Sequence, residues 1–468
     1  MEHHAGLRLG TMLLGAAALA CSSGSRPESD TNAPRPLPAS APARRAIVTG
    51  TVMPVDAVRL YQSMGLLADG APVPFVGSVA FLAGKAADST LALITLSIPN
   101  RSLTFGREGD QYQASYQVAI EVRRNGELVA RAEGTEQVRV PIFKETARTD
   151  ESIIFQQLLN LPPGAGDITV TVRDEPTAKS SSASRSMVIP KLDGRRLSTP
   201  VAFYEVTPRT STDSLPRIMS SPRSTIVFGR DSVVPLYVEA YGSDDRVLIG
   251  ATAIGDGNAR LWSDTIALTR HGRLVSGVVR VPSTRLGIGV ARVALQRLDT
   301  GDSVSTPVFI SLGEDLPVAT YEQMVSYLRY FASPGRLSAL ENAAPEQRAA
   351  AWAAFVREIT PGGAGSSEEL RAYFQRIEIA NSRFRDEGVA GWLGQRGMVF
   401  ITLGEPDQIR EPNAMDVNQR GKVQIWDYTN RRLQLVFVDQ SGFGRWQLTP
   451  SSMNDFQSVA RSIQDQHR

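Results

Sequence analysis

Short segments of alternating apolar and polar residues constrain the fold of this chain more than any other feature. Between Ala46 and Leu192 they include FVGSVAFLAG, LALITLSIP, YQASYQVAIEV and DITVTVRD, and between Val201 and Leu312 they include SVVPLYVEAYG, RVLIGATAIG and GVARVALQRL. Successive side chains of a strand point to opposite faces, so a period of two predicts half-buried β-strands. Because these strands are short, numerous and separated by turns, we expect two antiparallel β-sandwich (Ig-like) domains, residues 46–195 and 200–315.

The sharpest local signal is a hairpin centred on Asn125-Gly126. Both residues tolerate the positive φ angles that a type I′ turn requires. The residues expected on the buried face of its first strand are Tyr112, Ala114, Tyr116, Val118, Ile120 and Val122. By the same argument His271-Gly272, between two alternating runs, is predicted as a turn and not as a catalytic histidine. The run RDEPTAKSSSASRSMVIP is predicted as a polar hairpin loop leading into a last strand.

Beyond Tyr321 the apolar period becomes that of a helix. Residues three and four apart share one helical face, so three apolar stripes predict three helices. The stripes are Tyr321, Met324, Leu328 and Phe331; Trp352, Phe355, Val356 and Ile359; and Leu370, Tyr373, Phe374, Ile377 and Phe384. Pro334-Gly335 is expected to end the first helix, Pro345 to open the second, and Ser366 with Glu369 to cap the third.

Strand-like runs complete the chain: MVFITL, KVQIWDY, LQLVFVD and GRWQLTP. We expect them to form an antiparallel sheet against the helices, followed by a final helix that Ser451 or Ser452 caps. Residues 318–468 are therefore predicted as an α+β domain. The whole chain is predicted to be multidomain, with two β-sandwiches followed by this α+β domain, each with its own core.

The first residues predict export and attachment to a membrane. Arg8 precedes LGTMLLGAAALAC, whose apolar run of about ten residues is too short to span a bilayer as a helix and is typical of a signal peptide, residues 1–20. Its end, Ala18-Leu19-Ala20-Cys21, resembles the lipobox of bacterial lipoproteins, which implies lipidation of Cys21. The alternative is an ordinary signal peptide with an incidental cysteine. Residues 21–45 are rich in Pro, Ser and Ala and are expected to be a disordered tether.

Ser22 directly after the modified cysteine resembles lipoproteins that are sent to the outer membrane of Gram-negative-type bacteria. The expected location is therefore the cell envelope, with the chain anchored to a membrane by its N-terminal lipid.

Composition excludes several classes of function. Cys21 is the only cysteine, so neither an internal disulfide nor a cysteine-based zinc site can form. The 50 basic and 48 acidic residues are spread along the chain, so no concentrated positive field favours nucleic acid. Gly287-Ile288-Gly289 lacks the third glycine of a dinucleotide fingerprint and is predicted as a turn. We expect no metal and no cofactor, and the sequence does not predict an oligomeric state.

The C-terminal region resembles the GWxTD domain proteins of bacterial envelopes. The resemblance covers about the last 150 residues and rests on Gly391-Trp392, RGMVFITLGEPDQI, IWDY and LVFVDQSGFGRWQL, in that order. This chain reads Gly391-Trp392-Leu393-Gly394-Gln395 where the family signature has Thr and Asp at the last two positions. The signature residues that the resemblance marks as structural are Gly391, Trp392, Gly397, Gly404, Pro406, Asp407, Trp426, Asp439, Gly442 and Gly444.

The missing hydroxyl and carboxylate favour a structural role for the signature. Leu-Gly-Gln carries no titratable group, so any chemistry that depends on the threonine and aspartate is lost here. The enzymatic alternative is an envelope hydrolase that uses carboxylates near Glu405 and Asp407, with Asp427 and Asp439 as further candidates. Since no nucleophile elbow, phosphate loop or His/Cys cluster accompanies them, we assign no catalytic residue and expect a binding or scaffold role with an envelope protein or a glycan as partner.

Overall fold

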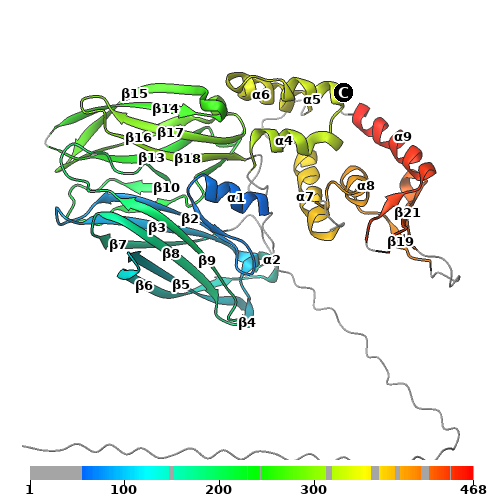
Figure 1. Ribbon diagram of the computed structural model, residues 1–468, viewed down its shortest axis with the longest axis horizontal. Helices are drawn as coiled ribbons and strands as arrows, with labels where there is room; N and C mark the ends of the chain where they lie inside the picture. Colours follow the sequence, from blue (N-terminus) through cyan, green and yellow to red (C-terminus); the bar gives the residue numbers. More distant parts are fainter. Residues whose placement is uncertain are drawn as a thin grey trace, which may run out of the picture. The chain divides into compact units, whose positions relative to one another are not determined.

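The computed structural model describes residues 55–146, 152–228, 230–242, 244–311, 319–359, 368–384, 390–412, 421–442 and 444–466 (Figure 1). The chain divides into two units, Met1–Val48 and Thr49–Arg468, and all described residues belong to the second. The predicted signal peptide, Cys21 and the tether lie outside the described residues. None of the described helices combines the length and the apolar character needed to cross a bilayer.

Two antiparallel sheets form the first β region, which follows helix α1 (Val55–Ser63). One sheet has the order β1-β2-β3-β7, with bounds Leu67–Asp69, Phe75–Ala83, Thr90–Pro99 and Ser152–Leu161. The other has the order β4-β5-β8-β9, with bounds Gly106–Glu108, Gln111–Arg124, Gly164–Asp174 and Ser180–Ile189; β6 (Glu127–Val140) also pairs with β5, and the short α2 (Phe143–Thr146) follows it. Buried residues of both sheets form one hydrophobic cluster.

The predicted hairpin is confirmed, and the loop predicted to lead into a last strand is shorter than expected, because it spans only residues 175–179 between β8 and β9. Asn125 and Gly126 have φ angles of 51° and 84° between β5 and β6. Residues 180–189, by contrast, form strand β9. The Ser184 and Ser182 hydroxyls bond those of Thr169 and Thr171 on β8, at 2.8 and 3.0 Å. Small polar residues are therefore accommodated as a strand, because the neighbouring strand offers matching hydroxyls.

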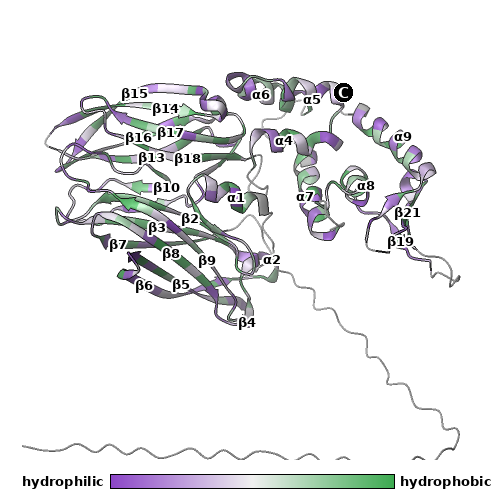
Figure 2. Ribbon diagram, viewed as in Figure 1, coloured by the Kyte–Doolittle hydropathy of each residue, from purple (hydrophilic) through white to green (hydrophobic). Residues whose placement is uncertain are grey.

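A second β region forms one path of nine strands in the order β11-β10-β13-β16-β15-β14-β17-β18-β12. Their bounds are β10 (Val201–Thr207), β11 (Arg217–Ser220), β12 (Thr225–Val227), β13 (Val233–Ala240), β14 (Arg246–Ile254), β15 (Arg260–His271), β16 (Leu274–Pro282), β17 (Gly289–Arg297) and β18 (Ser303–Ser311); α3 (Ser283–Leu286) lies between β16 and β17. Of the strand pairs described, only β12 with β18 is parallel. The turn predicted at His271-Gly272 is confirmed, with β15 ending at His271 and Gly272 at φ 65°. Buried and more exposed residues alternate along β14 and β17, and Figure 2 shows apolar and polar residues mixed within the strands of this region.

Helices dominate the C-terminal region. They are α4 (Tyr321–Tyr327), α5 (Pro334–Glu341), α6 (Arg348–Ile359), α7 (Glu368–Arg383), α8 (Gln395–Leu403) and α9 (Pro450–Gln466). A four-stranded antiparallel sheet has the order β19-β20-β21-β22, with bounds Gln408–Arg410, Lys422–Tyr428, Leu433–Asp439 and Gln447–Leu448. All residues of the three predicted apolar stripes are buried. Thr320 and Gln323 form a capping box at the start of α4.

Three local predictions in this region are wrong. MVFITL lies in helix α8, and the fourth strand is β19 instead. Val399, Phe400 and Ile401 are consecutive and all buried, and periodicity cannot distinguish such a run from a buried strand. Pro334 opens α5 as its first residue. Thr449 precedes α9, and its hydroxyl accepts the Ser452 N–H at 3.3 Å, so the cap lies upstream of the two predicted serines. The cap predicted at Ser366 lies outside the described residues.

The second β region and the C-terminal region share one hydrophobic cluster, where separate cores were expected. Two glycines of the predicted turn explain the close approach. Gly287 and Gly289 have φ angles of 70° and 107°, and added side chains there would press against the backbone of Ala349 and Tyr321 at about 3.0 Å. The backbones of α6 and α4 therefore lie directly against this turn.

Candidate functional site

The signature segment lies in the turn between α7 and α8 and is held by glycine-to-backbone packing. A side chain on Gly391 would overlap the carbonyl oxygens of Ala380 and Phe384 at the end of α7, and one on Gly397 would overlap the carbonyl oxygen of Gly391. Only glycine permits this approach of the turn to both helices. The two glycines therefore fix the path of the chain around Trp392.

Trp392 forms the centre of an aromatic cluster. It is 8% exposed, and its ring meets those of Tyr327 and Tyr330 edge-on at centroid distances of 4.9 and 6.3 Å. The Arg329 guanidinium lies 5.0 Å from the ring centroid. The Trp392 backbone N–H donates to Asn381 Oδ1 at 3.2 Å. Edge-to-face rings and a stacked guanidinium each stabilise such a cluster, so the indole packs as a core residue.

The two positions where the signature departs from its family open helix α8. Gly394 is the N-cap, with φ −69° and ψ 157° and no side-chain cap hydrogen bond. Gln395 is the first helical residue, and its Oε1 accepts the Leu448 backbone N–H of β22 at 2.6 Å. A threonine at position 394 would supply the hydroxyl that N-caps normally provide. Position 394 therefore starts helix α8, and position 395 joins that helix to β22. Neither role requires a reactive group.

The Gly404-to-Asp407 turn joins α8 to the sheet. Gly404, at φ 86°, ends the helix, and its carbonyl accepts the Tyr428 hydroxyl at 3.1 Å. Pro406 is buried. Asp407 Oδ2 accepts the Thr429 N–H at 2.6 Å, while its own N–H donates to the Asp427 carbonyl at 2.9 Å. Arg383 Nη1 donates to both carboxylate oxygens of Glu405, at 2.6 and 2.7 Å, and this ion pair is solvent-exposed.

Asp427 is paired on the outward face of β20. Its carboxylate accepts from Arg410 at 2.8 and 3.2 Å and from Gln434 Nε2 at 2.8 Å. The Arg410 hydrogen bond, with that from Gln434, holds the pKa of Asp427 below its usual range.

Asp439 is fully buried and organises the loop that follows β21. Its carboxylate accepts from the Ser441 N–H and hydroxyl, the Gly442 N–H and the Gly444 N–H, at 3.2, 2.8, 3.0 and 2.7 Å. Gly442 and Gly444 have φ angles of 74° and 94°. Burial raises the pKa of Asp439, but these hydrogen bonds to the charged form outweigh it, so the net pKa is lowered.

Trp426, on β20, belongs to the centre of the same core. It is fully buried between the rings of Phe384 and Phe437, at centroid distances of 5.5 and 4.8 Å. Its Nε1 donates to Gln424 Oε1 at 2.8 Å. The structure thus places the signature residues in turns, in secondary-structure elements and in the core of the C-terminal region. Within the described part of the chain, no group of three or more His, Cys, Asp or Glu residues is placed to hold a metal.

A buried polar network that the sequence analysis missed joins the two β regions. Arg209 is paired through Nε and Nη2 with the carboxylate of Glu239, both at 2.8 Å, and the two side chains are 1% and 0% exposed. The Tyr237 and Tyr241 hydroxyls donate to the same carboxylate at 3.0 and 2.7 Å. Arg209 also donates to the Ala83 carbonyl of β2 at 2.8 Å. The signal in the sequence was the glutamate in VVPLYVEA, since a charge in a buried strand requires a partner.

An open groove of about 1050 Å³ lies along β10 and β11. Tyr204 and Met219 on its wall are 59% and 47% exposed. From β7, the Gln156 side chain donates to the Ile218 carbonyl at 2.9 Å and accepts the Ser220 N–H at 2.7 Å. This amide occupies the backbone edge of β11, which the sequence pattern did not predict.

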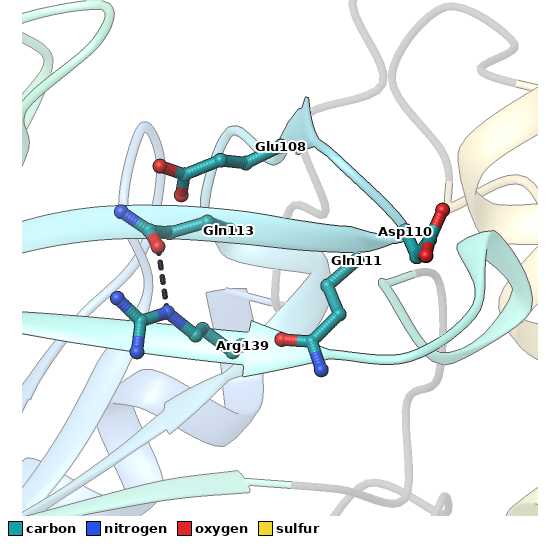
Figure 3. Close-up of a pocket in the computed structure, with 5 residues that line it drawn as sticks. All are labelled: Glu108, Asp110, Gln111, Gln113 and Arg139. Atoms are coloured by element: carbon teal, nitrogen blue, oxygen red, sulfur yellow. Dashed lines mark hydrogen bonds between the residues drawn. The ribbon is translucent and has the colours of Figure 1, made fainter.

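A smaller polar concavity of about 330 Å³ lies at the β4–β5 turn, lined by Glu108, Asp110, Gln111, Gln113 and Arg139 (Figure 3). Arg139 Nε donates to Gln113 Oε1 at 2.8 Å, and Asp110 lies at the turn, apart from this pair. Four of the five residues are exposed, as expected for the solvated face of an antiparallel sheet.

Comparisons with known proteins identify the C-terminal part. A family model described as the GWxTD domain matches residues 299–448. No curated protein matches the chain. Among solved structures, β-glucuronidase of Bifidobacterium dentium, complexed with coumarin-3-O-glucuronide, is 10% identical with a TM-score of 0.18, over 52% of this chain and 47% of that chain. Tandem Ig domains of titin are 12% identical with a TM-score of 0.13, over 50% and 97%. Scores this low assign neither fold nor function, and the chain spans about half of the β-glucuronidase.

Proposed function

Because residues 299–448 form a GWxTD domain, we propose that this chain is a lipid-anchored protein of the bacterial cell envelope with a non-catalytic binding or scaffold role. In this proposal Cys21 carries the lipid, residues 21–45 are the tether, and the membrane is the outer membrane of a Gram-negative-type cell. The β regions, as Ig-like sandwiches, hold the C-terminal unit away from the lipid surface.

The main support for a non-catalytic role is that the carboxylates an enzyme would need are already ion-paired or hydrogen-bonded. Glu405 is paired with Arg383, Asp407 accepts a backbone N–H, and Asp427 and Asp439 are each bound by several donors. A general acid must carry a proton near neutral pH, whereas the lowered pKa values of Asp427 and Asp439 keep both charged there. These contacts support a structural role for the four carboxylates.

For the binding surface we favour the groove along β10 and β11. Tyrosine, methionine and arginine are enriched at protein interfaces, and Tyr204, Met219 and Arg217 all line it. Since the Gln156 amide already occupies the edge of β11, a partner strand cannot pair there. The occupant we propose is an extended segment of an envelope protein whose apolar side chains contact Tyr204 and Met219. A glycan is a less favoured ligand, because the groove wall also contains the apolar side chains of Phe203, Ile218 and Val206.

Affinity capture with the full chain from detergent-solubilised envelope tests this proposal. Wild type and the control Leu128→Ser, which changes an exposed leucine of β6, should recover the same specific protein. The double variant Tyr204→Ser/Met219→Ser should lose it while keeping its circular dichroism spectrum. Recovery of no specific partner, together with cleavage of cell-wall glycan by the purified chain, would favour the hydrolase instead.

A further inference from the structure

A second cavity, of about 200 Å³, lies where the two β regions meet. Its wall includes the turn after α1, β2 and β9 of the first region and the chain around β10, β11, β17 and β18 of the second. Ligand sites for drug-sized molecules usually measure roughly 300–1,000 Å³. This cavity therefore suits a small ligand, or one end of a larger one.

The charge of this cavity is entirely positive. Arg185 and Arg292 line it, and none of the lining residues is acidic. Neither guanidinium has an ion-pair or hydrogen-bond partner within the described parts of the chain. The Arg185 guanidinium lies against Gly65, where an added side chain would overlap it, and burial lowers the pKa of Arg185 with no opposing charge. Both arginine residues are exposed, so water screens part of their charge, and an anion that entered the cavity would meet two cations and no acidic group.

Hydroxyl groups line the same cavity. Ser220, Ser221, Ser224 and Thr306 are all buried. Ser221 is 6% exposed, and its Oγ has no hydrogen-bond partner, although its backbone N–H donates to the Ala202 carbonyl at 2.8 Å. Buried hydroxyls normally have a partner. Ser221 therefore offers a buried, unpartnered hydroxyl in a cavity whose charged lining residues are both arginines.

We propose that this cavity binds a tetrahedral oxyanion, phosphate or sulfate, either free or as the terminal group of a small phosphorylated molecule. Each planar guanidinium group can donate two hydrogen bonds to such an anion, and serine hydroxyls can donate to its remaining oxygens. The site is separate from the groove and from the signature segment, so it does not depend on the proposed function. Its walls come from both β regions, so a bound anion bridges them.

Calorimetric titration of the full chain with inorganic phosphate, at constant ionic strength, tests the site. Wild type should bind with saturation at one site, and phosphate should raise the melting temperature, as any ligand of the native state does. Arg292→Gln and Ser221→Ala should each bind at least about tenfold more weakly. The control Arg131→Gln removes an arginine from an exposed pair with Glu133 and should bind as wild type does.

Further titrations identify the form of the ligand. Sulfate should compete with phosphate and acetate should not, because acetate is planar and carries fewer oxygens. Tighter binding of glycerol 3-phosphate than of inorganic phosphate would identify the ligand as an ester, and the reverse order would identify the free ion. No saturable binding by wild type, or an equal loss in Arg131→Gln and Arg292→Gln, would overturn the proposal.

Discussion

At the scale of single residues, Gly394 and Gln395 form the start of helix α8, where the family signature has Thr and Asp. The Gln395 side chain accepts the Leu448 N–H through Oε1 at 2.6 Å and so joins the start of α8 to β22. Gly394 keeps the extended N-cap conformation without a capping hydroxyl. The contacts of both residues are therefore those of a helix start.

Trp392→Ala should lower the free energy of unfolding by about 3–5 kcal/mol, because it leaves a cavity between Tyr327, Tyr330 and Arg329. Urea unfolding of the full chain measures the loss. The control Leu393→Ala changes the adjacent, 43% exposed side chain and should shift stability by no more than about 0.5 kcal/mol. A Trp392→Ala protein with unchanged stability that no longer captures a partner would make the indole a contact residue instead.

Asp439 should contribute to the pH dependence of stability. Its pKa is lower in the folded chain than the ordinary value of 3.8, so its contribution is present at neutral pH and is lost as pH falls from about 4 through the folded pKa. Urea midpoints measured from neutral pH down to about pH 3 should therefore fall less steeply for Asp439→Asn than for wild type. Parallel curves for the two proteins would contradict the role assigned to this carboxylate.

At the scale of elements, the close contact of α7, the signature turn and α8 depends on glycine. Gly397→Ala should cost about 1–3 kcal/mol, since the added methyl group overlaps the Gly391 carbonyl and forces the turn away from α8. Gly335→Ala in α5 is the matched control, because its new Cβ meets nothing within 4 Å and alanine favours helix. Thermal unfolding compares them; equal stability of both variants would mean that the turn can move at little cost.

Sequence periodicity predicted most strands and helices, and failed where burial hides the period. The Tyr112-to-Val122 alternation and the three aromatic stripes each face one side only, so the pattern identifies them. MVFITL is buried on several sides and carries no such contrast. For the site, residue type predicted the turns at Gly404, Asp407, Gly442 and Gly444, whereas Asp427 lies within strand β20 and Gly397 within helix α8. The Arg209–Glu239 network, the Gln156 contact and the Arg185 cavity join residues far apart in sequence, which no local pattern can indicate.

At the scale of the whole molecule, hydrogen bonds join the two β regions, and a shared hydrophobic core joins the second β region to the C-terminal region. Arg209, Glu239, Tyr237 and Tyr241 tie the second β region to the first through Ala83. The second β region and the C-terminal helices share one core. Partner binding at β10 and β11 would therefore occur in the same β region whose core is shared with the C-terminal helices.

Cys21→Ser should release the chain from membranes and leave the melting temperature of the folded part unchanged, because the proposed anchor is the lipid alone. Fractionation of cells after a high-salt wash measures the release. The control Ser23→Ala alters a neighbouring tether residue and should remain with the membrane. A Cys21→Ser protein that stays in the membrane fraction would contradict the anchor.

The central claim is that the C-terminal carboxylates build turns and do not catalyse a reaction. The most direct measurement compares wild type with Glu405→Gln/Asp407→Asn for glycan release from purified cell walls and, in the same preparations, for the free energy of unfolding. We predict no glycan release by either protein and a lower stability of the variant. Release by wild type that the variant loses at unchanged stability would contradict the claim.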